Sequence, residues 1–346
     1  MNHSISDDEL LEGAEEIGRV THLKNIPRGK QKGKASSRKT IPAPRSLPLE
    51  TGLADQSDSK FEITYKAARH EAVWLEDSLS GFMDQKWFDD VLRMVKGGKE
   101  ASVYLCAGNP TTGLDFLAAK VYRPRRFRNL KNDWLYKEGR ANLDSSGNRI
   151  TNEGMLNAIR RRTEFGRELM HTSWLEHEFM VLKTLSAAGA DVPRPLASGN
   201  NAILMEYVGD EAMNAPTLNE VDLSTREARA LFERVIYNID LMLAQGLIHA
   251  DLSAYNILYW EGDIVLIDFP QAIRPEENNS ASQIFTRDVI RVCEYFERHG
   301  VPTQARRLAE SIWNRHHQPT LPSIDPKILR EDNNDERDIW ETLKNR

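Results

Sequence analysis

The stretch HADLSAYNILYWEGDIVLID, residues 249–268, decides the fold of this chain. It contains two short apolar runs, 257–260 and 264–267, separated by Glu261-Gly262-Asp263. Aliphatic, β-branched and aromatic residues on either side of a polar turn with glycine are typical of a β-hairpin. The sequence therefore predicts two antiparallel strands at this point.

The register of this hairpin decides which side chains meet. If the two arms pair symmetrically about Gly262, Trp260 lies opposite Ile264, and Asn256 lies opposite Asp268. Opposed residues share one face and lie roughly 5 Å apart. A slip of one residue would move them to different faces, so this register is a hypothesis.

The polar residues that flank the hairpin suit phosphoryl transfer. The amide oxygen of Asn256 and the carboxylate of Asp268 are hard oxygen ligands of the kind that Mg²⁺ accepts together with substrate phosphates. Asp251, in the preceding turn, can accept the proton of a substrate hydroxyl. A purely structural hairpin would use Asp and Asn only as turn residues. The His, Asp, Asn and Asp spacing favours a kinase site instead.

A phosphate-binding loop and a lysine are expected upstream of such a site. Residues 91–95 and 103–106 are predicted strands, and residues 97–102 form the turn between them. Only Gly98 and Val103 match the glycine-rich kinase pattern, so this loop is weak evidence by itself. In the next predicted strand, 117–122, Lys120 takes the position of the lysine that binds the α and β phosphates. A solvated strand lysine is the alternative.

The partner of Lys120 is expected on a following helix. Residues 171–185 have apolar side chains at helical spacing, and Ser173 with Glu176 forms a predicted capping box at the start. Glu178 borders the apolar stripe and is the expected partner. Glu176 is the second choice, because it is better used at the helix start.

Two further elements are expected between this helix and the catalytic stretch. Residues 202–208 form an apolar strand that leads to Gly209, and the backbone near Glu206 and Val208 is the predicted contact for an adenine edge. A plain edge strand would have the same pattern. Residues 224–246 are predicted to form a buried helix with a capping box at Ser224 and Glu227.

At this point the residues resemble the RIO family of atypical serine/threonine protein kinases. The matching segments, in the family's order, cover roughly residues 85 to 300 and are GGKEASVY, AAKVYR, WLEHEF, HADLSAYNILY and IDFPQAI. The resemblance implies an α+β, two-lobed protein-kinase-like fold with a β-rich N-lobe and a reduced helical C-lobe.

The resemblance also implies roles for individual residues. Asp251 would be the catalytic base, Asn256 and Asp268 would bind Mg²⁺ or Mn²⁺, and Lys120 with Glu178 would hold ATP. Phosphates would also contact the loop through Lys99 and Ser102. Family members autophosphorylate on serine, and some act as ATPases that form an aspartyl phosphate at the position of Asp268, chemistry that an ionised carboxylate permits.

Two absences agree with the resemblance. Ala250 stands where the kinase signature has arginine, so no cation there can bind a phosphorylated activation loop. No Ala-Pro-Glu follows Asp268, and residues 288–298 already look helical. The usual activation segment is therefore expected to be missing.

The expected organisation is one catalytic domain with tails. We expect a mostly disordered tail over 1–80, an N-lobe over 81–208 with a flexible polar insertion at 123–170, a C-lobe over 209–315, and a C-terminal tail over 316–346. Residues 1–80 lack a winged-helix pattern, which argues against the family branch that carries one and favours a bacterial source.

Composition limits the setting and the partners. The chain has 346 residues, 40% of them hydrophobic, with a net charge of −6 and two cysteines without metal or redox spacing. Together with the lack of an apolar stretch of membrane-spanning length, this predicts a cytoplasmic protein without a membrane partner. Residues 22–48 carry eight Lys or Arg and no Asp or Glu. They are predicted to bind RNA or a ribosomal particle through counterion release, with a solvated linker as the alternative.

Three functions then compete. The first is a RIO-type serine/threonine protein kinase that acts on a protein substrate or on itself. The second is a small-molecule phosphotransferase, since antibiotic and sugar kinases share the HxDxxxxN core. The third is an ATPase switch in ribosome or ribonucleoprotein assembly. The serine after Leu252 and the IDFPQ segment favour the first over the second.

Overall fold

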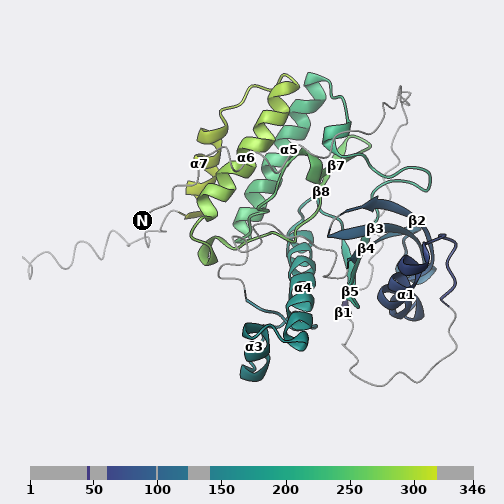
Figure 1. Ribbon diagram of the computed structural model, residues 1–346. Helices are drawn as coiled ribbons and strands as arrows, with labels where there is room; N and C mark the ends of the chain where they lie inside the picture. The colour runs from purple at the N-terminus through teal and green to yellow at the C-terminus, as the bar shows by residue number, and fades with distance from the viewer. Residues whose placement is uncertain (1–44, 47–60, 99, 124–140, 318–346) are drawn as a thin grey trace, which may run out of the picture. The chain divides into compact units, whose positions relative to one another are not determined.

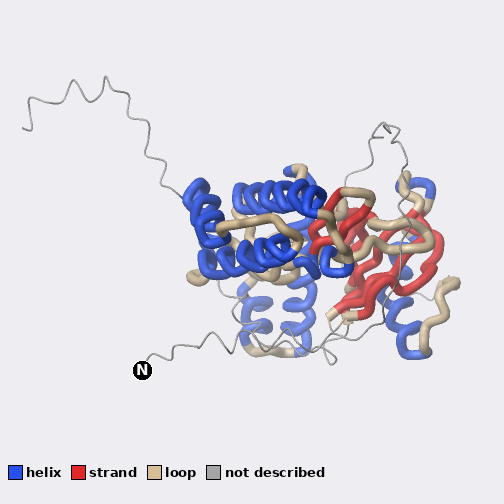
Figure 2. The backbone as a smooth tube through the Cα atoms, turned by 90° about the horizontal axis from the view of Figure 1, so that it is seen from above, coloured by secondary structure: helices blue, strands red, loops and turns tan. Residues whose placement is uncertain are grey.

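The structure is a computed structural model that describes residues 45–46, 61–98, 100–123 and 141–317. All of these belong to one compact unit, Ile41–Arg346. The strands of the large sheet gather in the N-terminal part of this unit, and the C-terminal part is mainly helical with one hairpin (Figures 1 and 2). The fold is therefore the α+β, kinase-like arrangement that was predicted. In the described ranges, no helix has the length and apolar character needed to cross a membrane.

The N-terminal part is a six-stranded sheet with the order β1-β5-β6-β4-β3-β2. Neighbouring strands pair antiparallel, except for β1 and β5, which pair parallel. The strands are β1 Arg45–Ser46, β2 Phe88–Gly97, β3 Ala101–Gly108, β4 Phe116–Tyr122, β5 Pro195–Gly199 and β6 Ala202–Glu206. The strands predicted over 91–95, 103–106 and 117–122 lie in this sheet, and the one predicted over 202–208 ends two residues earlier, at Glu206. The turn predicted over 97–102 is shorter than expected, because Gly97 still belongs to β2 and Ser102 already belongs to β3.

Helix α1, Arg69–Asp84, covers the sheet next to β2 (Figure 1). Its apolar stripe consists of Leu75, Leu79 and Phe82, which pack into one buried cluster with sheet residues such as Tyr104. This spacing places all three side chains on one face of a helix. Most of α1 lies within 1–80, the range expected to be a mostly disordered tail. That expectation is wrong for residues 69–80, because this stripe holds them on the sheet.

Helix α4, Glu164–Ala188, is longer than the predicted helix over 171–185. Its N-cap is Thr163, whose hydroxyl accepts a hydrogen bond from the Gly166 N–H at 3.1 Å. The predicted capping box at Ser173 and Glu176 is therefore wrong, since both residues lie inside the helix. The pattern S-x-x-E also occurs within helices, and here Thr163 supplies the acceptor that the orphan N–H groups require.

The segment expected to be a flexible insertion, 123–170, contains regular structure where it is described. A bridge joins Leu143 to Arg149, and α3, Glu153–Arg160, packs against α4. A Cβ added at Gly166 would lie 2.0 Å from the Ala158 carbonyl oxygen, so the two helices approach at a distance that only glycine permits. Residues 124–140 of the insertion lie outside the described residues.

The C-terminal part consists of three long helices and one hairpin. The helices are α5 Thr225–Ala244, α6 Ala281–Arg298 and α7 Ala305–His317, and the hairpin strands are β7 Ile257–Trp260 and β8 Asp263–Leu266. Short 3-10 helices occur at Pro110–Thr112, Leu218–Glu220, Ala254–Asn256 and Pro275–Glu277. Buried residues of α5, α6, α7 and the hairpin belong to one large cluster that includes Val235, Ile239, Val289 and Phe296.

Helix α5 begins as predicted, but only half of its capping box is present. The Ser224 hydroxyl accepts from the Glu227 N–H at 3.4 Å. The Glu227 carboxylate accepts instead from the Tyr259 hydroxyl of β7. The helix therefore begins where the sequence indicates, and Glu227 ties it to the hairpin.

The hairpin is present, but its predicted register is wrong by one residue. Trp260 pairs with Asp263, and Ile257 pairs with Leu266, so the turn contains only Glu261 and Gly262. Both turn residues have positive φ angles, 51° and 95°, as in the two-residue turns that fit the twist of antiparallel strands. Asn256 consequently faces Ile267, whose N–H donates to the Asn256 carbonyl at 3.0 Å.

The chain between the hairpin and α6 is short. After Asp268 it passes through residues 269–280, which include the 3-10 helix Pro275–Glu277, and enters α6 at Ala281. The activation segment of ordinary kinases has no counterpart among these described residues, as the sequence predicted.

Candidate functional site

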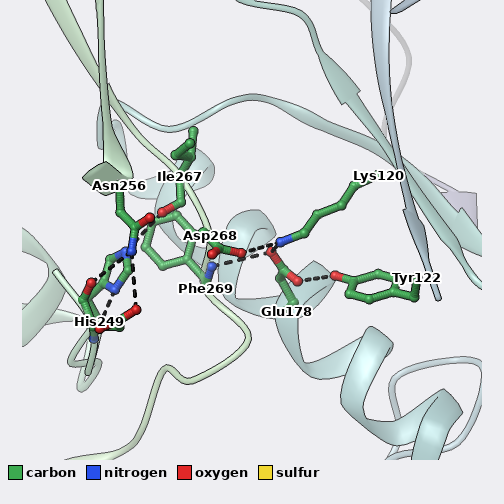
Figure 3. Close-up of polar contacts among 9 residues, drawn as sticks. Lys120, Tyr122, Glu178, His249, Asn256, Ile267, Asp268 and Phe269 are labelled. Atoms are coloured by element: carbon green, nitrogen blue, oxygen red, sulfur yellow. Dashed lines mark hydrogen bonds and ion pairs between the residues drawn. The ribbon is translucent and has the colours of Figure 1, made fainter. Parts of the chain in front are cut away.

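The candidate site is built around Lys120 of β4. Its ammonium group lies 2.7 Å from Glu178 Oε1 on α4 and 2.5 Å from Asp268 Oδ1, which follows β8. Figure 3 shows the three side chains converging from three elements. Of the two glutamates considered from the sequence, Glu178 is the one that reaches Lys120.

Register and packing place these groups. Lys120 lies opposite Val103 of β3 and Ile203 of β6, so it sits in the middle of the sheet. Glu178 is 1% exposed and is held by two further donors, the Tyr122 hydroxyl and the Phe269 N–H, the latter at 3.3 Å (Figure 3). A buried carboxylate with three donors is satisfied and fixed in orientation.

The opposite charges of Lys120 and Asp268 change the pKa values of both groups. Burial alone would lower the pKa of Lys120, but the carboxylates of Asp268 and Glu178 outweigh it and raise this pKa above its ordinary value. Desolvation acts to raise the pKa of Asp268, but the Lys120 ammonium outweighs it and lowers that pKa. Both groups are therefore charged at neutral pH. The Asp268 side chain remains 45% exposed, whereas Lys120 is 11% exposed, so the carboxylate faces open space.

The loop 249–256, which carries the predicted base Asp251, is fixed to the end of the hairpin by His249. This buried ring accepts a hydrogen bond from the Asp251 N–H at its Nδ1, at 3.3 Å, and its Nε2 lies 3.1 Å from the Ile267 carbonyl oxygen. This arrangement fits a neutral imidazole that carries its proton on Nε2. The histidine thereby connects the backbone of Asp251 with the backbone next to Asp268. Figure 3 shows His249, Ile267 and Asp268 at this point.

Asn256 lies one short helical turn after Asp251. Its side-chain amide donates to the Asp251 carbonyl oxygen at 2.9 Å and lies 3.4 Å from Asp251 Oδ2. Two non-glycine residues of this region, Ala250 and Asp268, have left-handed φ angles of 66° and 71°. Such conformations cost energy and are common at functional sites.

The Asn256 and Asp268 side chains fit a divalent cation by their chemistry. Because Asn256 uses its amide nitrogen to hold the loop, its amide oxygen is left to bind another group. Asp268 is ionised and half exposed, and both residues offer hard oxygen atoms of the kind that Mg²⁺ or Mn²⁺ prefers. The described residues contain no group of three or more His, Cys, Asp or Glu that could hold a metal. A cation here would therefore need substrate phosphates and water as further ligands.

The residues predicted for nucleotide binding are spread over the loop and the hinge. Gly98 lies in the tight turn after β2, where a Cβ would meet the Ala101 carbonyl oxygen at 2.9 Å. Ser102 and Val103 lie in β3, and the Ser102 side chain is buried and accepts from Arg123 Nη2 at 3.5 Å. Lys99 lies outside the described residues.

The predicted hinge leaves the sheet directly after β6. Glu206 is the last residue of β6, and its N–H donates to the Arg194 carbonyl at 2.9 Å. Val208 follows it and accepts from the Ala215 N–H at 3.0 Å. The hinge backbone is thus fixed on both sides. Its contact with a nucleotide stays a prediction.

Several residues around the site were missed by the sequence analysis. Tyr122 contacts Glu178, and two residues of α6 contact the loop 249–256: Arg287 and Arg291. For Tyr122 a signal existed, since it lies two positions after Lys120 and therefore on the same face of β4. For the α6 residues the sequence held no signal, because their role depends on how that helix packs.

Comparison with known proteins agrees with this geometry. Residues 116–308 match the RIO domain, which is more than half of the chain. Three known proteins share 29–32% sequence identity with this chain over the aligned residues. A "RIO-type serine/threonine-protein kinase Rio1" from Thermoplasma acidophilum is 30% identical over 40% of this chain and 72% of the relative. A protein of the same name from Haloferax volcanii is 29% identical over 63% of this chain and 67% of the relative. The human "Serine/threonine-protein kinase RIO1" is 32% identical over 40% of this chain and 24% of the relative.

Proposed function

The chain belongs to the RIO family, and we propose that it is an ATP-dependent serine/threonine protein kinase that phosphorylates a protein substrate and itself. The observation that carries this proposal is the convergence of Lys120, Glu178 and Asp268 beside the loop that bears Asp251 and Asn256. The relatives' names favour a protein kinase over a small-molecule phosphotransferase.

In the proposed reaction, a serine hydroxyl of the substrate attacks the γ-phosphorus of ATP. The new bond joins the hydroxyl oxygen to phosphorus, the bond from phosphorus to the β–γ bridging oxygen breaks, and ADP leaves. Asp251 accepts the hydroxyl proton, and Lys120 binds the α and β phosphates while Glu178 keeps its ammonium in place. A divalent cation held by Asn256 and Asp268 would neutralise charge on the phosphates.

One observation favours a second function, an ATPase that passes through an aspartyl phosphate at Asp268. The Asp268 carboxylate is ionised and 45% exposed, so one oxygen can act as a nucleophile when it lies in line with the γ-phosphate. In that case the bond from the γ-phosphorus to the β–γ bridging oxygen would break and ADP would leave as the aspartyl phosphate forms. Water would later cleave the acyl phosphate and release inorganic phosphate. Such a cycle would suit a switch in ribosome or ribonucleoprotein assembly.

The proposal extends to the predicted partner and setting. The basic stretch 22–48 would bind RNA or a ribosomal particle in the cytoplasm, since its charge allows counterion release. Apart from residues 45–46, this stretch lies outside the described residues. Filter binding of the full chain and of a variant with the lysines of 22–48 replaced by glutamine tests it, and equal RNA affinity would contradict it.

The experiment that separates the two functions is labelling with γ-labelled ATP. We expect acid-stable phosphoserine in the wild type, lost in Asp251→Ala and in Asp268→Asn. A label that hydroxylamine removes, lost in Asp268→Asn, would establish the ATPase cycle instead. The matched control is Asp263→Asn, which changes an exposed aspartate of the same hairpin. Absence of label and of hydrolysis in the wild type would contradict both functions.

A further inference from the structure

Helix α6 holds two consecutive residues of the loop 249–256. Each contact joins one helix residue to one loop residue: Arg287 Nη2 donates to the Ala250 carbonyl oxygen at 2.5 Å, and Arg291 Nη1 donates to Asp251 Oδ1 at 3.2 Å. Positions i and i+4 lie along one side of a helix. This side of α6 therefore fixes the shape of the loop.

Arg291 differs from Arg287 in what it contacts. Arg287 holds loop backbone, whereas Arg291 forms an ion pair with the side chain of the proposed base, Asp251. The Arg291 and Asp251 side chains are 38% and 44% exposed, so the pair opens to the solvent from which an acceptor arrives. An ion pair this exposed contributes little to stability, so its removal should leave the fold intact.

The contact restricts the orientation of the Asp251 carboxylate. A carboxylate turns easily about its Cβ–Cγ bond, because that torsion has broad minima. Here Oδ1 accepts from the charged Arg291 at 3.2 Å, and Oδ2 accepts a longer hydrogen bond, 3.4 Å, from the neutral Asn256 amide, which leaves Oδ2 a further lone pair. With Oδ1 held by a charge-assisted hydrogen bond, Oδ2 is left as the oxygen that can meet a hydroxyl proton.

Arg291 also supplies a cation where the local sequence supplies none. Ala250 stands immediately before Asp251, at the position of the arginine in the kinase signature. Lys120 is committed to Glu178 and Asp268. Among the described residues, the cation that forms an ion pair with Asp251 comes from α6, far along the chain.

We infer that Arg291 is a positioning residue that holds Asp251 Oδ1 and thereby directs Asp251 Oδ2 toward the acceptor hydroxyl. This inference rests on the proposed kinase function. Arg291 takes no proton and forms no bond to phosphorus. It acts through the base, so its loss slows transfer without changing how ATP is bound.

The test is steady-state phosphate transfer by the full chain at saturating ATP. In Arg291→Gln we expect kcat to fall on the order of tenfold, because a small misplacement of a reacting group is costly, with the KM for ATP and the melting temperature unchanged. In Arg291→Ala, added guanidinium ion should restore part of kcat, because the exposed position admits it. Arg298→Gln, on the same helix at an exposed position, is the matched control and should retain the wild-type kcat.

Three results would overturn the inference while leaving the kinase intact: wild-type kcat in Arg291→Gln, a rise in the KM for ATP with kcat unchanged, or no recovery of Arg291→Ala with guanidinium. Asp251→Ala must not respond to guanidinium, since a response would show that the ion acts elsewhere and would also count against the role of Arg291. If the wild type transfers no phosphate to protein, the proposed function fails, and the inference fails with it.

Discussion

Two buried glutamates on one helix, Glu178 and Glu176, differ in almost everything except burial. They are 1% and 2% exposed and lie two positions apart on α4. Residues at i and i+2 point to different sides of a helix. Glu178 points to β4 and the end of the hairpin, and Glu176 points to β5, where the Ser198 hydroxyl donates to it at 3.0 Å.

The difference between their partners shows what makes a site. Glu178 meets an ammonium group, a phenol and an N–H, whereas the donor to Glu176 is a hydroxyl. Burial raises the pKa of Glu176 to about 7; the Asp144 carboxylate adds to this, and the Ser198 hydroxyl and Lys183 oppose it. Burial of a carboxylate is therefore not a sign of catalysis by itself. The cation next to it is the informative feature.

The largest effect is expected from Lys120→Met. This substitution removes the cation that pairs with Glu178. Loss of one preorganised electrostatic group costs on the order of 10²–10³ in kcat. It also leaves Glu178 buried without a counter-charge, which destabilises a fold by about 3–5 kcal/mol. Phosphate transfer and urea unfolding measure the two effects. Lys66→Met, at an exposed lysine outside the sheet, is the control, and equal losses in both variants would contradict the assignment.

A direct test of the comparison pairs Glu178→Gln with Glu176→Gln. Each replaces a buried carboxylate by a neutral amide of similar shape. We expect Glu178→Gln to lower kcat/KM roughly ten- to hundredfold, because Lys120 loses one of its two anionic partners. Glu176→Gln should keep wild-type kinetics. If the two variants lose activity alike, the distinction between the two sides of α4 is wrong.

Much of this site could be predicted from local spacing. The strand with Lys120, the choice of Glu178, the hairpin and the missing activation segment all follow from patterns within about twenty residues, where helical and strand periods determine which face a residue takes. The start of α4 could not be predicted in this way. The Ser173-x-x-Glu176 pattern looked like a cap, and the structure shows that Thr163 caps the helix about three turns earlier.

Two other kinds of feature could not be predicted from the sequence: the exact length of a turn and the contacts between distant elements. The hairpin register was wrong by one residue because the sequence does not distinguish a two-residue from a three-residue turn at Glu261-Gly262-Asp263. The contacts of Arg291 with Asp251 and of Ser198 with Glu176 join residues 40 and 22 positions apart. Periodicity within one element carries no information about such contacts.

A smaller effect is expected from Tyr122→Phe. The phenol donates to the second oxygen of Glu178, so its removal leaves that buried oxygen without this donor. A lost hydrogen bond of this kind is worth about 1 kcal/mol, or roughly fivefold in kcat/KM if it holds Glu178 toward Lys120. The matched control is Tyr104→Phe, because the Tyr104 hydroxyl donates to Glu71 of α1 at 2.8 Å, away from the site. A loss of activity in the control equal to that in Tyr122→Phe would show that the effect is only structural.

The smallest effect on activity, and the clearest on stability, is expected at Glu176. Its pKa is raised to about 7 in the folded chain, above its ordinary value of 4.5, so between these values the folded state binds a proton that the unfolded state has released. The free energy of unfolding must therefore fall as pH rises through this window, by roughly 2–3 kcal/mol from this group. Glutamine does not titrate, so Glu176→Gln lacks this pH-dependent contribution to the free energy of unfolding.

The measurement is urea unfolding of the wild type and of Glu176→Gln at pH 5 and pH 8. Subtracting one protein from the other removes the titration of all groups that they share. We expect Glu176→Gln to gain stability relative to the wild type at pH 8 compared with pH 5. A difference that does not change with pH would mean that Glu176 is ionised in the folded chain at both pH values. The two glutamates of α4 would then be alike in charge and would differ only in whether a lysine reaches them.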